Sequence, residues 1–217
     1  MKQTDRAEKQ LDLLLQRYPV LAGQKEEIRR AYQVMAAGYA ADGKLLIAGN
    51  GGSAADAEHI VGELMKGFKN PRRVDAALAE RLLQESPELG PELAQNLQKA
   101  LPAIALDGHP ALTTAYANDC VPLLCFAQQV NGYGRAGDVL LVISTSGKSK
   151  NIQYAAVTAR AIGMKVVGLT GATESPLLPL CDVCIRVPLQ ETYQIQELHM
   201  PIYHCLCLML EEHFFAE

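Results

Sequence analysis

Two short loops rich in glycine and serine are the first candidates for chemistry. They are Gly49-Asn50-Gly51-Gly52-Ser53 and Ser144-Thr145-Ser146-Gly147-Lys148-Ser149. Glycine lets the main chain approach a ligand closely, and free N–H groups at a helix start, joined by hydroxyls, favour an anion. Neither loop has the GxxxxGK[ST] pattern of a Walker loop or the third glycine of GxGxxG. Together they predict a phosphate site; the alternative is two tight turns with capping serines.

A second group of candidates consists of histidine, carboxylate and amide side chains on two expected helices. His59 and Glu63 are four residues apart and share one helix face. The C-terminal helix carries Gln196, Glu197, His199 and His204. Such a set could bind a metal ion or act as general acid and base. Spacing alone leaves open the alternative of hydrogen-bonded core histidines and a surface carboxylate.

Alternating patterns predict the elements that position these residues. We expect helices over residues 4–17 and 24–41, a long helix over 191–215, and strands at 44–48, 103–106, 138–143, 165–169 and 184–187. Strands that alternate with helices predict an α/β fold, a parallel sheet flanked by helices. Both serine loops then follow strands, at the edge where such sheets bind ligands.

The expected organisation is a single domain over residues 1–217. It would have N-terminal helices within residues 1–42 and an insertion at about 70–100. Prolines punctuate that insertion, and helical patterns cover residues 76–83 and 93–100.

Composition limits the function classes. Apolar residues make up 49% and charged residues 20% of the 217, which is enough for a packed core. The net charge of −4 argues against a general nucleic-acid binder, which needs a clustered positive surface. No secretory signal is visible, and apolar stretches such as 139–143 are too short to span a membrane. We therefore expect a cytoplasmic protein with neither nucleic-acid nor membrane partners.

Six cysteines include one CxxC pair, Cys181 and Cys184. That spacing is compatible with a redox or zinc site. However, the pair begins an alternating strand rather than a helix, and no second CxxC completes a zinc tetrad. A structural role in a reducing compartment is the preferred interpretation.

Taken together, five stretches resemble the sugar isomerase (SIS) domain family and, within it, the phosphoheptose isomerases. They are residues 49–59, 101–106, 117–119, 137–149 and 195–199. The resemblance implies a parallel sheet flanked by helices and a homotetramer, or at least a dimer, joined through the N-terminal helices. It also implies an aldose–ketose isomerisation of sedoheptulose 7-phosphate to D-glycero-D-manno-heptose 7-phosphate.

The resemblance further implies a role for each matching residue. Glu63 would be the base and His204 the acid, and zinc, one ion per subunit, would be held by His59, Glu63, Gln196 and His204. The phosphate would be held by Ser53, Ser144, Ser146 and Ser149, with Thr145 nearby. The remaining substrate-binding positions would be Asn50, Gly51, Gly52, Asn118, Asp119 and Gln196.

The chain departs from the family at one position of the expected site. The family usually has an arginine four residues after the glutamate, whereas this chain has Gly67, with Lys66 and Lys69 as possible substitutes. Two alternatives remain: an enzyme for another phosphosugar, and a non-catalytic phosphosugar- or protein-binding module like the DnaA initiator-associating protein. The presence of both Glu63 and His204 favours an enzyme, because that replication protein replaces both.

Overall fold

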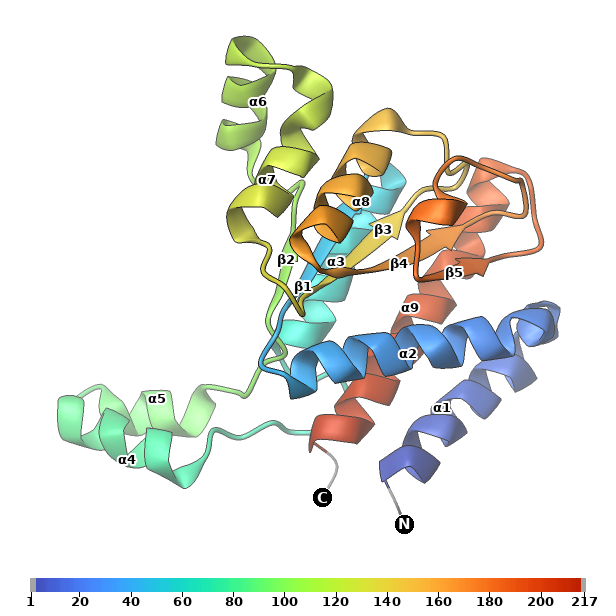
Figure 1. The fold of residues 1–217 in the computed structure, drawn as a ribbon. Coiled ribbons are helices and arrows are strands. Elements are labelled where there is room, and N and C mark those ends of the chain that lie inside the picture. Colours follow the sequence, from blue (N-terminus) through green and yellow to red (C-terminus); the bar gives the residue numbers. More distant parts are fainter. Residues whose placement is uncertain (1–2, 216–217) are drawn as a thin grey trace.

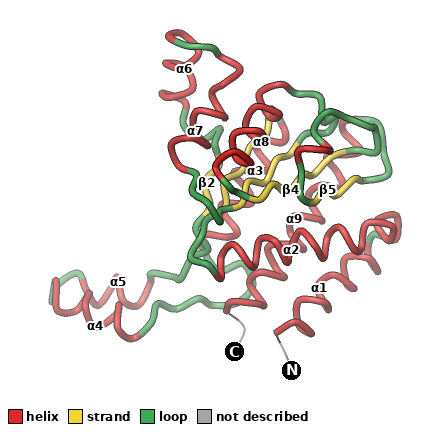
Figure 2. Tube along the Cα trace, viewed as in Figure 1, coloured by secondary structure: helices red, strands yellow, loops and turns green. Residues whose placement is uncertain are grey.

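A five-stranded parallel sheet forms the centre of the computed structural model, which describes residues 3–215 and side chains from residue 6 onward. The strand order is β2-β1-β3-β4-β5. The strands are β1 (Leu45–Gly49), β2 (Ala103–Ala105), β3 (Val139–Ile143), β4 (Lys165–Thr170) and β5 (Val183–Arg186). Figure 2 shows the strands gathered in the middle with helices around them.

The helices fill the chain between and around the strands (Figure 1). The N-terminal pair is α1 (Gln3–Arg17) and α2 (Lys25–Ala40), joined by the 3-10 helix η1 (Pro19–Gln24). The others are α3 (Gly52–Met65), α4 (Ala76–Glu85), α5 (Gly90–Asn96), α6 (Pro110–Asp119), η2 (Pro122–Leu124), α7 (Cys125–Tyr133), α8 (Lys150–Ile162), η3 (Leu178–Leu180) and α9 (Thr192–Phe215).

Two apolar cores lie on opposite faces of the sheet. Successive side chains of a strand point to opposite faces, so Leu45 and Ile47 belong to one core and Leu46 and Ala48 to the other. The first core includes α1, α2, α3 and α9, and the second includes α7 and α8. The result is a sheet between two helical layers, which explains why its strands read as continuous apolar runs.

The segment after α3 forms a helical hairpin that projects from the body of the molecule (Figure 1). Helices α4 and α5 pack against each other, and no residue of α4 is buried. At the root, the Lys99 N–H donates to the carbonyl of Arg72 over 2.6 Å, and Arg73 pairs with Gln98. The hairpin therefore starts beside the C-terminal end of α3, away from the serine loops at the N-terminal end of that helix.

The expected fold class is confirmed, and the expected strands lie within one or two residues of the observed ones. The second helical piece of the insertion was predicted at 93–100, but α5 spans Gly90–Asn96. The prediction failed there because Gln98 and Lys99 are extended and pair with the Arg72–Arg73 segment. Among the residues described, no helix is both long and apolar enough to cross a membrane.

Candidate active site

The two serine loops lie side by side because β1 and β3 are neighbouring strands. Gly49 and Ile143, the last residues of these strands, are in register. The first loop turns into α3 through Gly51, whose φ of +58° is in the left-handed region that favours glycine. Gly147 has a φ of +63° in the second loop, before α8. Both predicted anion-binding loops therefore lead into helix N-termini at the same sheet edge.

A pair of side-chain amides joins the two loops directly. Asn50 Nδ2 donates to Asn151 Oδ1 over 3.1 Å, and Asn151 Nδ2 donates back to Asn50 Oδ1 over 2.8 Å. Asn50 was among the predicted site residues, whereas Asn151 was missed because it lies just beyond the loop, in the first turn of α8. This double hydrogen bond links the two loops across the sheet edge.

The serine hydroxyls of the two loops differ in burial and in the hydrogen bonds that they already make. Ser53 and Ser144 are buried, and Ser144 Oγ accepts from the N–H of Gly147 over 3.2 Å. Ser146 is exposed and its Oγ accepts from the N–H of Lys148. Ser149 precedes α8 as its N-cap residue and makes no side-chain capping bond. Ser146 and Ser149 thus retain hydroxyl protons that can be donated to a ligand.

Glu63, His59 and His204 come together between α3 and α9. His59 Nε2 lies 3.3 Å from Glu63 Oε1 and 3.4 Å from His204 Nε2. The His59 and His204 rings meet edge to face, with centroids 4.9 Å apart, and Phe68 covers the His204 ring from another side. The predicted base and acid are therefore both in contact with one histidine.

A lysine supplies the positive charge beside Glu63. Lys66 Nζ lies 3.1 Å from Glu63 Oε2, so a lysine supplies a cation next to the carboxylate where the family usually has an arginine one position later. Burial lowers the pKa of His204, and the neighbouring His59 lowers it further, while Glu63 opposes the shift. A lowered pKa favours the neutral imidazole, which can both accept and donate a proton.

Three predicted residues lie apart from this group. The amide of Gln196 sits against Gly52, where a Cβ would come within 2.6 Å of Nε2. Gly52 is seven residues before His59, which is about 10 Å along α3. Because α3 and α9 run side by side in the same direction, Gln196 lies beside Gly52 while His204 lies beside His59. Asn118 and Asp119 are exposed on α6, where Asn118 Nδ2 donates to Asp119 Oδ1 over 2.7 Å.

The contacts behind His59 and Glu63 were not predicted. The hydroxyl of Tyr203 lies 3.0 Å from His59 Nδ1 and 3.2 Å from Asp56 Oδ1. The guanidinium of Arg72 donates to the main-chain carbonyls of Leu64 and Glu63 at the end of α3. The sequence could have indicated Asp56, because it is three residues before His59 and therefore lies on the same face of the helix.

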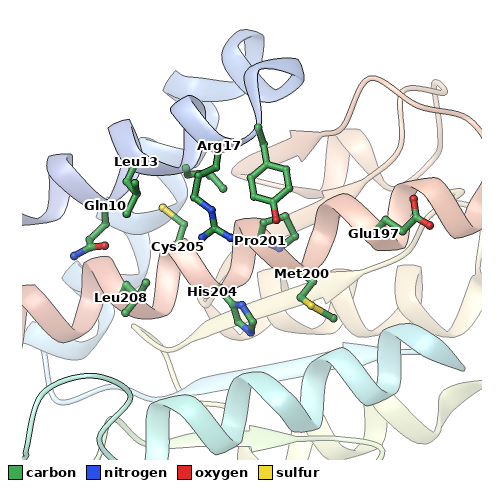
Figure 3. Close-up of a pocket in the computed structure, with 11 residues that line it drawn as sticks. Gln10, Leu13, Arg17, Glu197, Met200, Pro201, His204, Cys205 and Leu208 are labelled. Atoms are coloured by element: carbon green, nitrogen blue, oxygen red, sulfur yellow. The ribbon is translucent and has the colours of Figure 1, made fainter.

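A groove of about 330 Å³ reaches His204 from the side of α1 (Figure 3). In Figure 3 the His204 ring points from α9 toward α3, away from the α1 residues Gln10, Leu13 and Arg17. Met200 and Leu208 flank His204 along α9. The acid–base group is thus at the surface between helices rather than sealed in the core.

The arrangement can bind an anion at one end of α3 and transfer protons further along the same helix. A carboxylate that contacts a lysine and a histidine can remove a proton from carbon, and a neutral histidine can exchange protons with oxygen. Enolisation of a carbonyl compound that carries an anionic group fits this combination. Glu63 and His204 are the groups with the chemistry for the two steps.

Comparisons with known proteins show the family of the chain. A family model described as "SIS domain" matches residues 12–86 and 86–171. The phosphoheptose isomerase of Rhodospirillum rubrum is 38% identical over 185 residues, 85% of each chain. That of Nitratiruptor sp. is 40% identical over 171 residues, covering 79% of this chain and 78% of the relative.

Solved structures give the same result. The phosphoheptose isomerase of Francisella tularensis has a TM-score of 0.73 at 31% identity, covering 97% of this chain and 98% of that one. The corresponding enzyme of Neisseria gonorrhoeae has a TM-score of 0.68 at 30% identity, covering 96% and 92%.

Proposed function

Since the chain belongs to the SIS domain family and is homologous to phosphoheptose isomerases, we propose that it is an aldose–ketose isomerase of a phosphorylated sugar. The substrate we propose is sedoheptulose 7-phosphate and the product D-glycero-D-manno-heptose 7-phosphate. The observation that carries the proposal is the contact of Glu63 and His204 with one histidine, His59, on the helix that begins at the first serine loop.

The proposed reaction needs one base and one acid. Glu63 takes a proton from C1 of the ketose, which gives an enediol, and returns a proton to C2. His204 moves a proton between the two oxygens, so that the C2 carbonyl becomes a hydroxyl while the C1 hydroxyl becomes an aldehyde. Lys66 holds one oxygen of the Glu63 carboxylate and leaves the other facing His59. Both carbons keep four bonds throughout and no external oxidant is required.

The phosphate would be held at the start of α3 and α8. Hydroxyls of Ser53, Ser144, Ser146 and Ser149, together with main-chain N–H groups at both helix starts, support this assignment. Asn50 and Gln196 lie near the same edge and would orient the sugar hydroxyls. Binding the phosphate there separates it from the reacting carbons by part of the length of α3, which suits a long sugar phosphate.

Zinc forms part of the proposal, and two distances support it. Ligand atoms of a tetrahedral zinc site with bonds of about 2.0–2.1 Å lie about 3.3–3.4 Å apart. The pairs His59–Glu63 and His59–His204 have such separations. Yet no group of three histidine, cysteine, aspartate or glutamate side chains in residues 3–215 is arranged to hold a metal ion, and Gln196 lies at Gly52. We therefore derive no step through the metal, which would polarise the sugar carbonyl if bound.

Oligomerisation is also proposed, as a homotetramer or at least a dimer. The support is the side of α1 and α9 shown in Figure 3, where Leu13 and Met200 are 45% and 46% exposed beside the groove. Burying such side chains between copies would be favourable.

Replacing Glu63 tests the assignment of the base. We expect Glu63→Gln to reduce kcat for sedoheptulose 7-phosphate by about 10²–10⁴-fold, because the amide cannot take the proton. Substrate affinity should change little. NMR spectroscopy of the sugar phosphates would follow the isomerisation.

Glu58→Gln is the matched control, since Glu58 is an exposed glutamate on the same helix. It should keep wild-type kcat. Wild-type kcat in Glu63→Gln would remove Glu63 as the base.

A further inference from the structure

A chain of hydrogen bonds runs from the interior of the protein to the candidate acid–base group. Tyr203 is 1% exposed, and its hydroxyl lies within hydrogen-bond distance of Asp56 Oδ1 (3.2 Å) and His59 Nδ1 (3.0 Å). The other ring nitrogen of His59 faces Glu63 and His204. We propose that Asp56 and Tyr203 are positioning residues that hold His59 in the tautomer protonated at Nδ1, so that its Nε2 lone pair faces Glu63 and His204.

Counting protons distinguishes the two neutral tautomers. A tyrosine hydroxyl carries one proton, and a carboxylate can only accept. If Tyr203 donates to Asp56, its oxygen must accept from His59 Nδ1–H, and Nε2 is bare. If Tyr203 instead donates to His59 Nδ1, then Nε2 carries the proton and Asp56 faces a hydroxyl oxygen with no proton between them.

The partners of the two carboxylates favour the first arrangement. Glu63 has a second donor, because Lys66 Nζ lies 3.1 Å from its Oε2. For Asp56, the hydrogen bond recorded within residues 3–215 is the one from Tyr203. The tautomer with Nδ1–H therefore leaves each carboxylate with a donor, whereas the other leaves Asp56, which is partly buried, without one. Leaving a partly buried carboxylate without a protein donor is unfavourable, because burial has removed part of its hydration.

This tautomer has two consequences for the site, both of which deepen the function proposed above and rest on it. His204 Nε2, 3.4 Å from the bare His59 Nε2, must carry its own proton there to form a hydrogen bond, and that is the proton an acid would donate. In addition, His59 Nε2 and Glu63 Oε1 become two acceptors 3.3 Å apart. Glu63 Oε1 therefore keeps its lone pairs for a substrate proton or a cation, whereas the opposite tautomer would engage that oxygen in an internal hydrogen bond with His59.

The test is the tautomer itself, measured in the full-length protein with ¹⁵N-labelled histidine at pH 8. Long-range ¹H–¹⁵N correlation spectra distinguish a protonated ring nitrogen from a bare one, and His59→Gln identifies the His59 signals. We expect protonated Nδ1 and bare Nε2. A proton on Nε2, alone or together with one on Nδ1, would overturn the proposal.

Two substitutions make the test directional. Asp56→Ala frees the Tyr203 proton for His59 Nδ1, so the His59 spectrum should change to protonated Nε2. Tyr203→Phe removes both hydrogen bonds, so a mixture of the two tautomers should appear. Unchanged His59 signals in both variants would mean that Asp56 and Tyr203 do not set the tautomer.

Tyr32→Phe provides the matched control. Tyr32 makes the same kind of contact elsewhere, with its hydroxyl 2.7 Å from His213 Nδ1. This variant should alter the His213 signals and leave those of His59 unchanged. A change at His59 in Tyr32→Phe would show that the spectra report general loosening rather than the proposed contact.

Kinetics separates this inference from the proposed function. Tyr203→Phe should lower kcat about tenfold with KM within twofold of wild type, as is typical when the support of a site residue is removed. A wild-type protein with the expected tautomer but no isomerase activity would reject the proposed function alone. An active wild type with His59 protonated at Nε2 would reject the inference alone.

Discussion

Glu63 is held through one carboxylate oxygen by Lys66 Nζ at 3.1 Å, and its other oxygen lies 3.3 Å from His59 Nε2. Its side chain is only 14% exposed. A carboxylate fixed in this way loses little further side-chain entropy when it meets a substrate proton, which is the kind of preorganisation a general base needs. His204 contacts the same histidine from α9.

Ser146 carries the prediction for the phosphate site. Its exposed hydroxyl accepts a main-chain hydrogen bond and keeps its proton free for an anion. We expect Ser146→Ala to weaken the affinity for the sugar phosphate by about 1–3 kcal/mol, because a hydrogen bond to a charged group is lost. Titration calorimetry with the sugar phosphate would measure the change.

Ser86→Ala serves as the control, since Ser86 lies in the hairpin and its hydroxyl also accepts a main-chain hydrogen bond, from Leu89. It should leave the affinity unchanged. Equal affinities for wild type and Ser146→Ala would place the phosphate elsewhere.

Single residues show what the sequence can and cannot reveal about the site. His59 and Glu63 share a helix face by their spacing, so their proximity follows from helix geometry. The contact with His204 required knowledge of how α3 and α9 pack, which the family resemblance supplied and the structure now shows. Tyr203 was missed because, beside an apolar helix face, a tyrosine reads as an ordinary core residue. Its partners become evident only in three dimensions.

At the level of elements, a buried ion pair fixes the end of α3 against α9. Arg72 and Glu211 are 0% and 1% exposed, and Arg72 Nε donates to Glu211 Oε1 over 2.9 Å. Burial raises the pKa of Glu211, but N–H groups of Phe68 and Lys69 and the Arg72 guanidinium outweigh this and lower it. The pair therefore ties three segments together: α3, the root of the hairpin and α9.

Replacing Arg72 should lower the stability of the fold. We expect Arg72→Met to reduce the free energy of unfolding by about 3 kcal/mol or more, because Glu211 loses its counter-charge in a buried position. Chemical denaturation would measure it.

The neighbouring Arg73→Met, at an exposed position, should stay within about 0.5 kcal/mol of wild type. Similar values for the two variants would mean that the ion pair contributes nothing to the stability of the fold.

The elements that the sequence predicted least well belong to the hairpin. Strands β1 and β3 are uninterrupted apolar runs bounded by glycine and polar residues, so their positions were clear. Helix α5 ends at Asn96 because the chain then pairs with Arg72 and Arg73, a long-range contact that leaves no local pattern. The CxxC pair is explained by the sheet, since Cys181 and Cys184 fill the space over Gly168 of β4.

For the whole molecule, one buried histidine gives the stability a dependence on pH. His199 is 0% exposed, and burial lowers its pKa to about 4 from the ordinary 6.5, while the Thr170 main chain opposes the shift. Between these two values the unfolded chain binds a proton that the folded chain does not. Stability is therefore lost as the pH falls from 6.5 toward 4, by about 3 kcal/mol from this group.

His199→Leu should lack this part of the pH dependence. The measurement is the free energy of unfolding of both proteins at pH 7 and at pH 4.5, where the difference between them should change in favour of the variant. A difference that does not vary with pH would show that His199 does not titrate in this way.

The sheet order, the two helical layers and the position of the serine loops bring the first serine loop, His59 and Glu63 together along one helix, α3, with His204 of α9 beside them. The most direct measurement uses the wild-type protein and sedoheptulose 7-phosphate in deuterated water, with NMR spectroscopy and mass spectrometry of the recovered sugars. We expect an aldoheptose 7-phosphate to form with deuterium at the carbon that received a proton. Tight binding of the sugar phosphate with neither product nor deuterium incorporation would contradict the proposed isomerase.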